Sequence, residues 1–204
     1  MKILIHPKIE AVLQQTIFPD LKKGRKDFDL PHTKAVVFWM KHLLIHDPEI
    51  INLIKNKTIN PKVMITAAYA HDWGYIGLFD NASSNSLQNI LERKKLHMKR
   101  GSQMIEQLLY AKLSKAFTNT EILMVSHLVL FHDELKKLKT DAEILIMQAD
   151  TLGMLDTSRI KPTFSKKDRE KFLKSVYELR LPRFKHKEAK KIAETLLSEY
   201  TRLH

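Results

Sequence analysis

The sequence predicts an all-α protein, and three observations support this fold class. Glycine and proline, which often interrupt helices, number only five and seven in 204 residues. No alternating apolar and polar pattern of useful length, which would indicate a half-buried strand, occurs in the chain. The length corresponds to one domain, large enough to bury about two thirds of the surface that its unfolded chain would expose. We therefore expect residues 1–204 to form a single helical domain.

The individual helices are predicted from apolar spacing and from the residues at their ends. Pro31 and Pro61 stand where helices begin, and Pro162 and Pro182 separate the last ones. The polar stretch from Gly77 to Ser86 predicts a loop that shapes the mouth of a site. In chain order, the expected helices cover residues 7–16, 32–46, 48–56, 61–71, 85–92, 95–113, 119–133, 141–155, 166–179 and 186–203.

The chain contains no cysteine, which excludes a disulfide framework, a thiolate nucleophile and a cysteine-bound metal. Any metal must therefore be held by nitrogen and oxygen atoms. The first residues lack the long apolar core of a signal peptide, and no run of about 18 apolar residues occurs. We expect a soluble, cytoplasmic protein that has no membrane partner.

The formal net charge is +12, and much of it lies in short basic clusters. Such a surface attracts anions, which include nucleotides, phosphorylated metabolites and nucleic acid. The alternative is that lysines interleaved with acidic residues only form the solvated face of amphipathic helices. Nucleic acid is not the favoured partner, because duplex binding needs a continuous basic groove that scattered clusters do not clearly make. The clusters cover residues 22–26, 93–100, 136–139, 166–174 and 183–191.

The most informative feature is the doublet His71-Asp72, which closes the apolar run 63–70 and is followed by Trp73. Adjacent residues cannot share one helix face, but at the end of a helix, where the backbone leaves the helical path, both side chains can turn toward one point. Imidazole and carboxylate together suit Fe, Mn, Co, Ni or Zn, with Mg as a further candidate. Further histidines and a carboxylate lie in or beside other apolar segments, at His32, His97, His127 and Asp150.

In this order, these residues resemble the ligand pattern of the HD-domain metal-dependent phosphohydrolase superfamily. The local contexts "LPHTKAVVFWMKHL", "AAYAHDWGY" and "LIMQADTLGMLD" are similar to its first helix, its doublet and its closing helix. The resemblance covers roughly residues 28–156 and implies a helical bundle with a metal site in its centre. We expect the helices within 166–203 to pack on this core.

The resemblance implies a metal site of His32, His71, Asp72 and Asp150, with room for one ion or two. Asp72 would then bridge to a second metal held by His97 and His127, which makes Asp72 a catalytic residue as well. His132 follows His127 by five residues, about 140° around a regular helix, so both cannot face one ion. We instead consider His132 as a proton donor in catalysis.

Phosphate chemistry also needs cations around the substrate. Lys94 and Arg100 lie three residues from His97, and Lys34 lies two residues after His32. Arg159 occupies a region in which several superfamily members place an arginine that binds substrate. We expect these four residues to contact a small anionic phosphorylated substrate.

The sequence leaves three functions open. The leading one is hydrolysis of a phosphate ester or anhydride in a nucleotide or another small phosphorylated metabolite. The second is a dimetal oxygenase, because myo-inositol oxygenase and its phosphonate-cleaving relatives share the ligand order. The third is a non-catalytic or nucleic-acid-binding HD module, which would predict damaged ligand positions, whereas all six are filled here.

Overall fold

Helices are the only regular secondary structure within the residues that the computed structural model describes, which are 3–25, 27–79 and 86–202. This confirms the predicted fold class. Residues 80–85 of the expected loop lie outside the described part of the chain. The helices are α1 (Pro7–Leu21), α2 (Asp29–His46), α3 (Pro48–Lys55), α4 (Pro61–Ala70), α5 (Leu87–Leu113), α6 (Asn119–Phe131), α7 (Asp141–Leu155), α8 (Lys166–Ser175) and α9 (Lys187–Arg202), with short turns η1 (Trp73–Tyr75), η2 (Val176–Arg180) and η3 (Leu181–Arg183).

Three helices differ clearly from the sequence prediction. The helix expected at 7–16 continues to Leu21. The helices expected at 85–92 and 95–113 form one continuous helix, α5. Arg93 and Lys94, which join the two expected helices, are good helix formers and do not interrupt the backbone. The helix expected at 166–179 ends at Ser175 and continues as the π-helical turn η2. This change of winding sets the position of Arg180, which becomes important below.

Polar caps determine where several helices begin. The Asn60 side chain accepts a hydrogen bond from the Lys62 backbone N–H, and Pro61 occupies the first turn of α4. Thr118 and Thr140 each form a reciprocal capping box with a glutamate three residues later, at the beginning of α6 and α7. Each cap satisfies backbone N–H groups that have no partner inside the helix.

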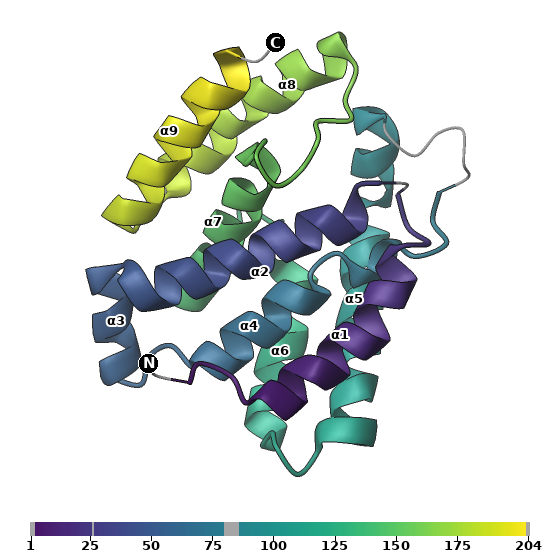
Figure 1. The fold of residues 1–204 in the computed structure, drawn as a ribbon, viewed down its shortest axis with the longest axis vertical. Helices are drawn as coiled ribbons and strands as arrows, with labels where there is room; N and C mark the ends of the chain where they lie inside the picture. Colours follow the sequence, from purple (N-terminus) through teal and green to yellow (C-terminus); the bar gives the residue numbers. More distant parts are fainter. Residues whose placement is uncertain (1–2, 26, 80–85, 203–204) are drawn as a thin grey trace.

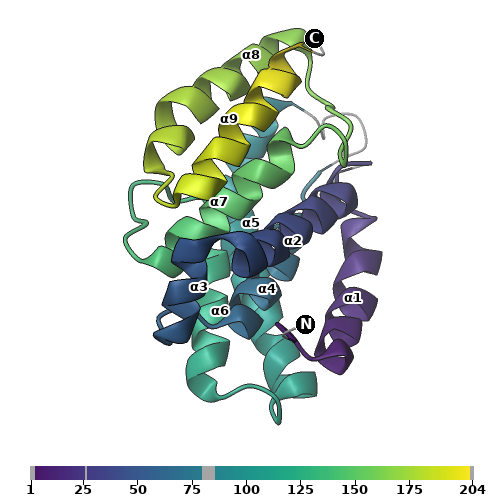
Figure 2. The same cartoon turned by 60° about the vertical axis from the view of Figure 1, so that its left-hand side comes forward.

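Helix α2 crosses the centre of the molecule and packs against α4 and α7, while α5 packs along α6 (Figure 1). Helices α8 and α9 lie side by side at the end of the molecule opposite the α5–α6 turn, as both views show (Figure 2). Within the described residues, no helix is both long enough and apolar enough to cross a membrane.

Candidate metal centre

The doublet lies where the sequence analysis expects it, at the end of α4. His71 still has helical backbone angles (φ −54°, ψ −42°), whereas Asp72 departs from them (φ −103°, ψ 4°). Both side chains are buried, and His71 Nε2 lies 3.6 Å from Asp72 Oδ2. The end of the helix thus lets two adjacent residues face one point.

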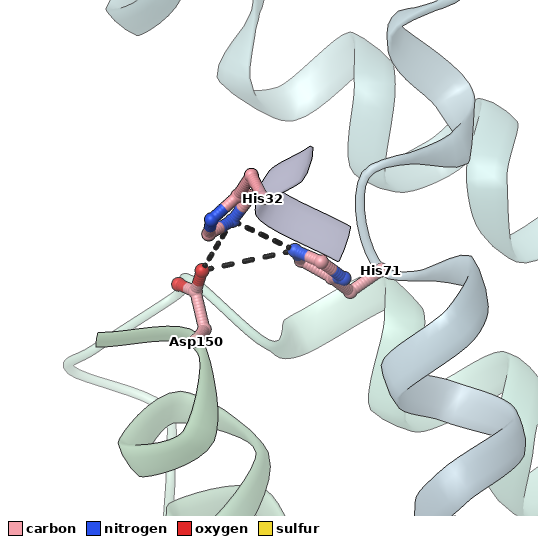
Figure 3. A group of neighbouring side chains, drawn as sticks. All are labelled: His32, His71 and Asp150. Atoms are coloured by element: carbon pink, nitrogen blue, oxygen red, sulfur yellow. Dashed lines mark hydrogen bonds and ion pairs between the residues drawn. The ribbon is translucent and has the colours of Figure 1, made fainter. Parts of the chain in front are cut away.

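A first group of ligand atoms comes from α2, the end of α4 and α7 (Figure 3). His32 Nε2 lies 3.1 Å from His71 Nε2 and 3.1 Å from Asp150 Oδ1. His71 Nε2 and Asp150 Oδ1 are 3.7 Å apart. All three side chains are buried, and their polar atoms converge on one point.

A second group comes from η1, α5 and the end of α6, and consists of Asp72, His97 and His132. His97 Nε2 lies 3.4 Å from Asp72 Oδ1 and 3.5 Å from His132 Nε2. His132 Nε2 lies 3.8 Å from the same carboxylate oxygen. These three residues are also buried.

Asp72 connects the two groups through its two oxygens. Oδ2 lies 3.6 Å from both His32 Nε2 and His71 Nε2, while Oδ1 faces His97 and His132. A carboxylate with one oxygen on each side is the arrangement that bridges two cations about 3.5–4 Å apart.

The donor atoms fit divalent metal. Nitrogen and oxygen ligands lie about 2.0–2.2 Å from such an ion, so neighbouring ligands of one ion stand roughly 2.8–3.1 Å apart in an octahedral site and roughly 3.3–3.6 Å apart in a tetrahedral one. The separations here run from 3.1 to 3.8 Å. The Nδ1 atoms of His71 and His132 face the carbonyl oxygens of Ala68 and Val129 at 2.9 and 2.8 Å, as donors would. With that tautomer, each Nε2 presents a lone pair to the cluster.

The electrostatics favour the protonation states that metal ligands need. Burial alone would raise the pKa of Asp72 and Asp150, but nearby His71 and Arg25 outweigh it for Asp72, and Arg180 and His32 outweigh it for Asp150, so both pKa values are lowered. Burial lowers the pKa of His97 to about 3. The carboxylates are therefore ionised, and the His97 imidazole is neutral, at ordinary pH.

Two glycines allow the close approaches that assemble the cluster. A Cβ atom on Gly74 would lie 1.9 Å from the carbonyl oxygen of His97, so only glycine lets η1 lie this close to α5. A Cβ atom on Gly153 would lie 2.6 Å from Val36 Cγ2, where α7 crosses α2. Val36 is one turn after His32, and Gly153 follows Asp150 by three residues, so this crossing sets those two ligands side by side.

Arg25 is a site residue that the sequence analysis did not single out. It is buried and donates through Nε to Asp29 Oδ1 (2.6 Å) and through Nη2 to Asp72 Oδ2 (3.0 Å). Its guanidinium also lies 4.5 Å from the ring centre of Phe28 and 4.4 Å from that of Tyr75. Arg25 therefore orients the bridging carboxylate from outside the cluster.

Arg180 is a second site residue that the sequence analysis did not single out, and it pairs with the Asp150 carboxylate. From the π-helical turn η2, its Nη1 donates to Asp150 Oδ2 at 2.9 Å and to Thr151 Oγ1 at 3.0 Å. Its Nη2 forms a short ion pair with Asp133. In the sequence Arg25 lies in the basic cluster 22–26, which looks like surface, and Arg180 lies between two other basic clusters, so no local signal marks either residue.

The structure places His127 and His132 differently from the sequence prediction. His127 points away from the cluster: its side chain is 45% exposed and pairs with Glu143 at 2.7 Å. Helix α6 ends at Phe131, so His132, on a different side of the helix, turns into the site and takes the place expected for His127. His132 therefore lies among the candidate metal ligands, and its role as a proton donor stays a prediction.

Of the residues expected to bind substrate, only Lys94 lines the cavity over the cluster, and its Nζ pairs with Asp133 Oδ2 at 2.9 Å. Lys34 is exposed, with Nζ 5.5 Å from the ring centre of Phe18. Arg159 pairs with Asp156 at 3.1 Å. The structure does not bring Lys34, Arg100 or Arg159 to the cavity: Lys34 and Arg100 face other directions on α2 and α5, and Arg159 lies in the turn after α7.

The cavity has a volume of about 360 Å³, within the usual range for a small-molecule site. Ligands of both groups form its inner end, and Arg25 and Arg180 line it beside them. The protein is therefore an all-α domain with a buried cluster of histidines and carboxylates that could hold metal. This arrangement can hold divalent metal next to a cavity for a small molecule.

The HD domain family matches residues 30–155, well over half of the chain, so the protein belongs to this family. HD domains bind divalent metals and are typical of metal-dependent phosphohydrolases. No curated protein and no solved structure matches the chain. Arg25 and Arg180 both lie outside the matched segment.

Proposed function

We propose that the protein is a metal-dependent hydrolase that cleaves a phosphate ester or anhydride in a small phosphorylated molecule, such as a nucleotide or another metabolite. The observation that carries this proposal is the position of Asp72 between two groups of buried ligands, with one carboxylate oxygen facing each group. A small anionic substrate, rather than nucleic acid, suits a cavity of about 360 Å³.

Two divalent cations held by these residues would polarise the phosphoryl oxygens and lower the pKa of a water molecule. The ligands would be His32, His71, Asp150 and one Asp72 oxygen for one ion, and the other Asp72 oxygen with His97 and His132 for the second. Arg25 and Arg180 would fix the two carboxylates, since each donates to an oxygen of one of them.

Lysines would supply the remaining positive charge around the substrate. Lys94 and Lys171 both line the cavity. Lys94 already pairs with Asp133, whereas Lys171 has no carboxylate partner among the described residues. A phosphate that enters the cavity would therefore meet a cationic side chain before it reaches the inner end.

The test is to purify the protein without chelator, measure bound metal by mass spectrometry, and assay phosphate release from a panel of phosphomonoesters, phosphodiesters and anhydrides. We expect bound divalent metal and metal-dependent hydrolysis, both lost in Asp72→Ala. Oxygen uptake with a polyol or phosphonate, without hydrolysis of any phosphate compound, would instead indicate the dimetal oxygenase. Metal-free protein that is folded and inactive would contradict both enzyme functions.

A further inference from the structure

The outer part of the cavity is apolar, and this bears on the organic part of the substrate. One wall is a stripe of α5, with Leu87, Ile90 and Leu91 at helical spacing, followed by Lys94 and His97 on the same side. From Leu87 to His97 the helix rises about 15 Å. An apolar wall thus leads directly to the metal ligands.

The facing wall comes from the C-terminal part of the chain, outside the matched HD segment. Phe164, Phe172 and Leu179 line the cavity from this side. The Leu87 backbone N–H approaches Asp168 Oδ2 at 3.4 Å, which joins the beginning of α5 to the first turn of α8. The C-terminal segment therefore closes the cavity with further apolar surface.

Two of these apolar side chains remain largely uncovered. Leu91 is 53% exposed and Leu179 is 48% exposed, although both line the cavity. Covering such side chains with an apolar ligand is favourable, because it removes their surface from water. They form an apolar rim at the site.

The same walls offer few groups that could recognise a base or a sugar. Among the described residues that line the cavity, Tyr75 and Ser175 carry the only hydroxyl groups, and no side-chain amide is present. Arg25, Lys94 and Arg180 are already paired with carboxylates. Hydroxyl groups of a sugar, or the polar edge of a base, would lose water here without gaining enough hydrogen-bond partners.

We propose that the substrate is a phosphate ester whose organic part is an apolar alkyl or aryl group, which lies between α5 and the C-terminal segment while the phosphate faces the metal ligands. This inference rests on the proposed function and narrows its substrate class. Lys171, on the same wall as Phe172, provides a cation for the phosphate as it enters.

The first test compares n-hexyl phosphate with glycerol 3-phosphate, which share a primary alkyl leaving group and differ in the polarity of the chain. We expect the metal-loaded protein to hydrolyse hexyl phosphate with a kcat/KM at least about tenfold higher, in line with burial of a few methylene groups. Glucose 6-phosphate and AMP serve as sugar and nucleotide arms. Equal or better turnover of any of these three polar esters would overturn the inference and leave the proposed hydrolase intact.

A binding measurement tests the inference without relying on turnover. Titration calorimetry of the metal-loaded protein compares hexylphosphonate with 2,3-dihydroxypropylphosphonate, neither of which can be hydrolysed at the carbon–phosphorus bond by this chemistry. We expect tighter binding and a more negative heat-capacity change for hexylphosphonate. If no ester is hydrolysed but hexylphosphonate is preferred, the hydrolase proposal fails while the apolar site stands; equal binding would contradict the apolar site.

Substitutions in the cavity test which side chains give the preference for an apolar ligand. Leu91→Asn and Leu179→Asn each replace an exposed leucine of the cavity, so neither should unfold the protein. Leu123→Asn is the matched control, because Leu123 is 55% exposed on α6 and does not line this cavity. We expect the preference for hexyl over dihydroxypropyl ligands to fall at least threefold in the two cavity variants, with metal content unchanged. An unchanged preference in both would show that this wall does not hold the organic group.

Discussion

Arg180 Nη1 donates a hydrogen bond of 2.9 Å to Asp150 Oδ2, while the other oxygen of Asp150 lies 3.1 Å from His32 Nε2. One carboxylate thus faces a ligand on one side and a buried arginine on the other. Asp72 also pairs with a buried arginine, Arg25, at 3.0 Å, but through Oδ2, the same oxygen that faces His32 and His71. Both arginines come from segments outside the HD match, so the flanking parts of this chain brace the ligands of its core.

Replacement of Arg180 should weaken metal binding without removing a ligand. In Arg180→Met, Asp150 and Asp133 lose their shared partner, so the Asp150 carboxylate is no longer held toward His32. We expect a loss of about tenfold to a hundredfold in metal affinity, as is common for residues that orient ligands. Competition with a fluorescent chelator measures this. Lys174→Met, at an exposed position of α8, is the control and should bind metal like the wild type.

Loss of Asp72 should have a larger effect, because both groups share its carboxylate. Asp72→Ala removes one oxygen from each, and we expect bound metal well below one ion per chain and no detectable hydrolysis. Asp72→Asn keeps the shape but not the charge and should bind metal weakly. Mass spectrometry of the purified variants gives the metal content; a variant Asp72→Ala that keeps two ions would contradict the bridging role.

His127 and His132 separate the ligand set expected from sequence from the one that the structure presents. His132→Ala should reduce the metal content toward one ion per chain, since only Asp72 and His97 remain in the second group. His127→Ala should keep the full metal content and lose the pair between the partly exposed His127 and Glu143, worth about 1 kcal/mol or less. The opposite pattern would restore His127 as the ligand.

Lowering the pH should reduce the stability of the folded protein through Glu143, which lies in the first turn of α7. Burial would raise the pKa of Glu143, but backbone N–H groups of Thr140 and Lys139 and the His127 side chain lower it from 4.5 to about 2. The folded state therefore prefers the ionised form, and its contribution to stability is present above pH 4.5 and is lost as the pH falls toward 2. Urea unfolding of metal-free protein should show Glu143→Gln less stable by about 1 kcal/mol at pH 7.

That difference should shrink between pH 4.5 and pH 2, because the wild-type carboxylate becomes protonated in this range. Glu199→Gln, at an exposed position of α9, is the matched control and should show no comparable change of stability with pH. A constant difference between wild type and Glu143→Gln down to pH 2 would contradict the assigned cause.

The fold and most of the ligands could be predicted from sequence because they depend on local pattern. Apolar spacing and caps define the helices, and the end of α4 after Ala70 explains how His71 and Asp72 face one point. The choice between His127 and His132 could not be made locally, since it depends on where α6 ends and on which of its sides packs toward α5.

Arg25 and Arg180 were beyond sequence reasoning for a related physical reason. Buried arginines are rare unless they are paired, and their partners Asp72 and Asp150 lie 47 and 30 residues away in the chain. Only the tertiary packing reveals the pairs. The apolar walls of the cavity could not be predicted from sequence for the same reason. The apolar stripe of α5 becomes a cavity wall only when α8 lies opposite.

The last prediction concerns Gly74, whose missing side chain lets η1 lie against α5. Gly74→Ala places a methyl group 1.9 Å from the His97 carbonyl oxygen and 2.5 Å from the Gly101 backbone nitrogen, and neither backbone atom can move without shifting α5. We expect the free energy of unfolding to fall by several kcal/mol, as for overpacking of a rigid core. Metal binding should also weaken, because Asp72 and His97 are pushed apart.

Gly77→Ala is the matched control: Gly77 has a positive φ of 67°, but nothing lies within 4 Å of the new methyl group. Its cost should be only about 1 kcal/mol of backbone strain, with metal affinity unchanged. Thermal unfolding with and without metal measures both effects, and equal behaviour of the two variants would show that the crossing of η1 and α5 does not set the ligand geometry.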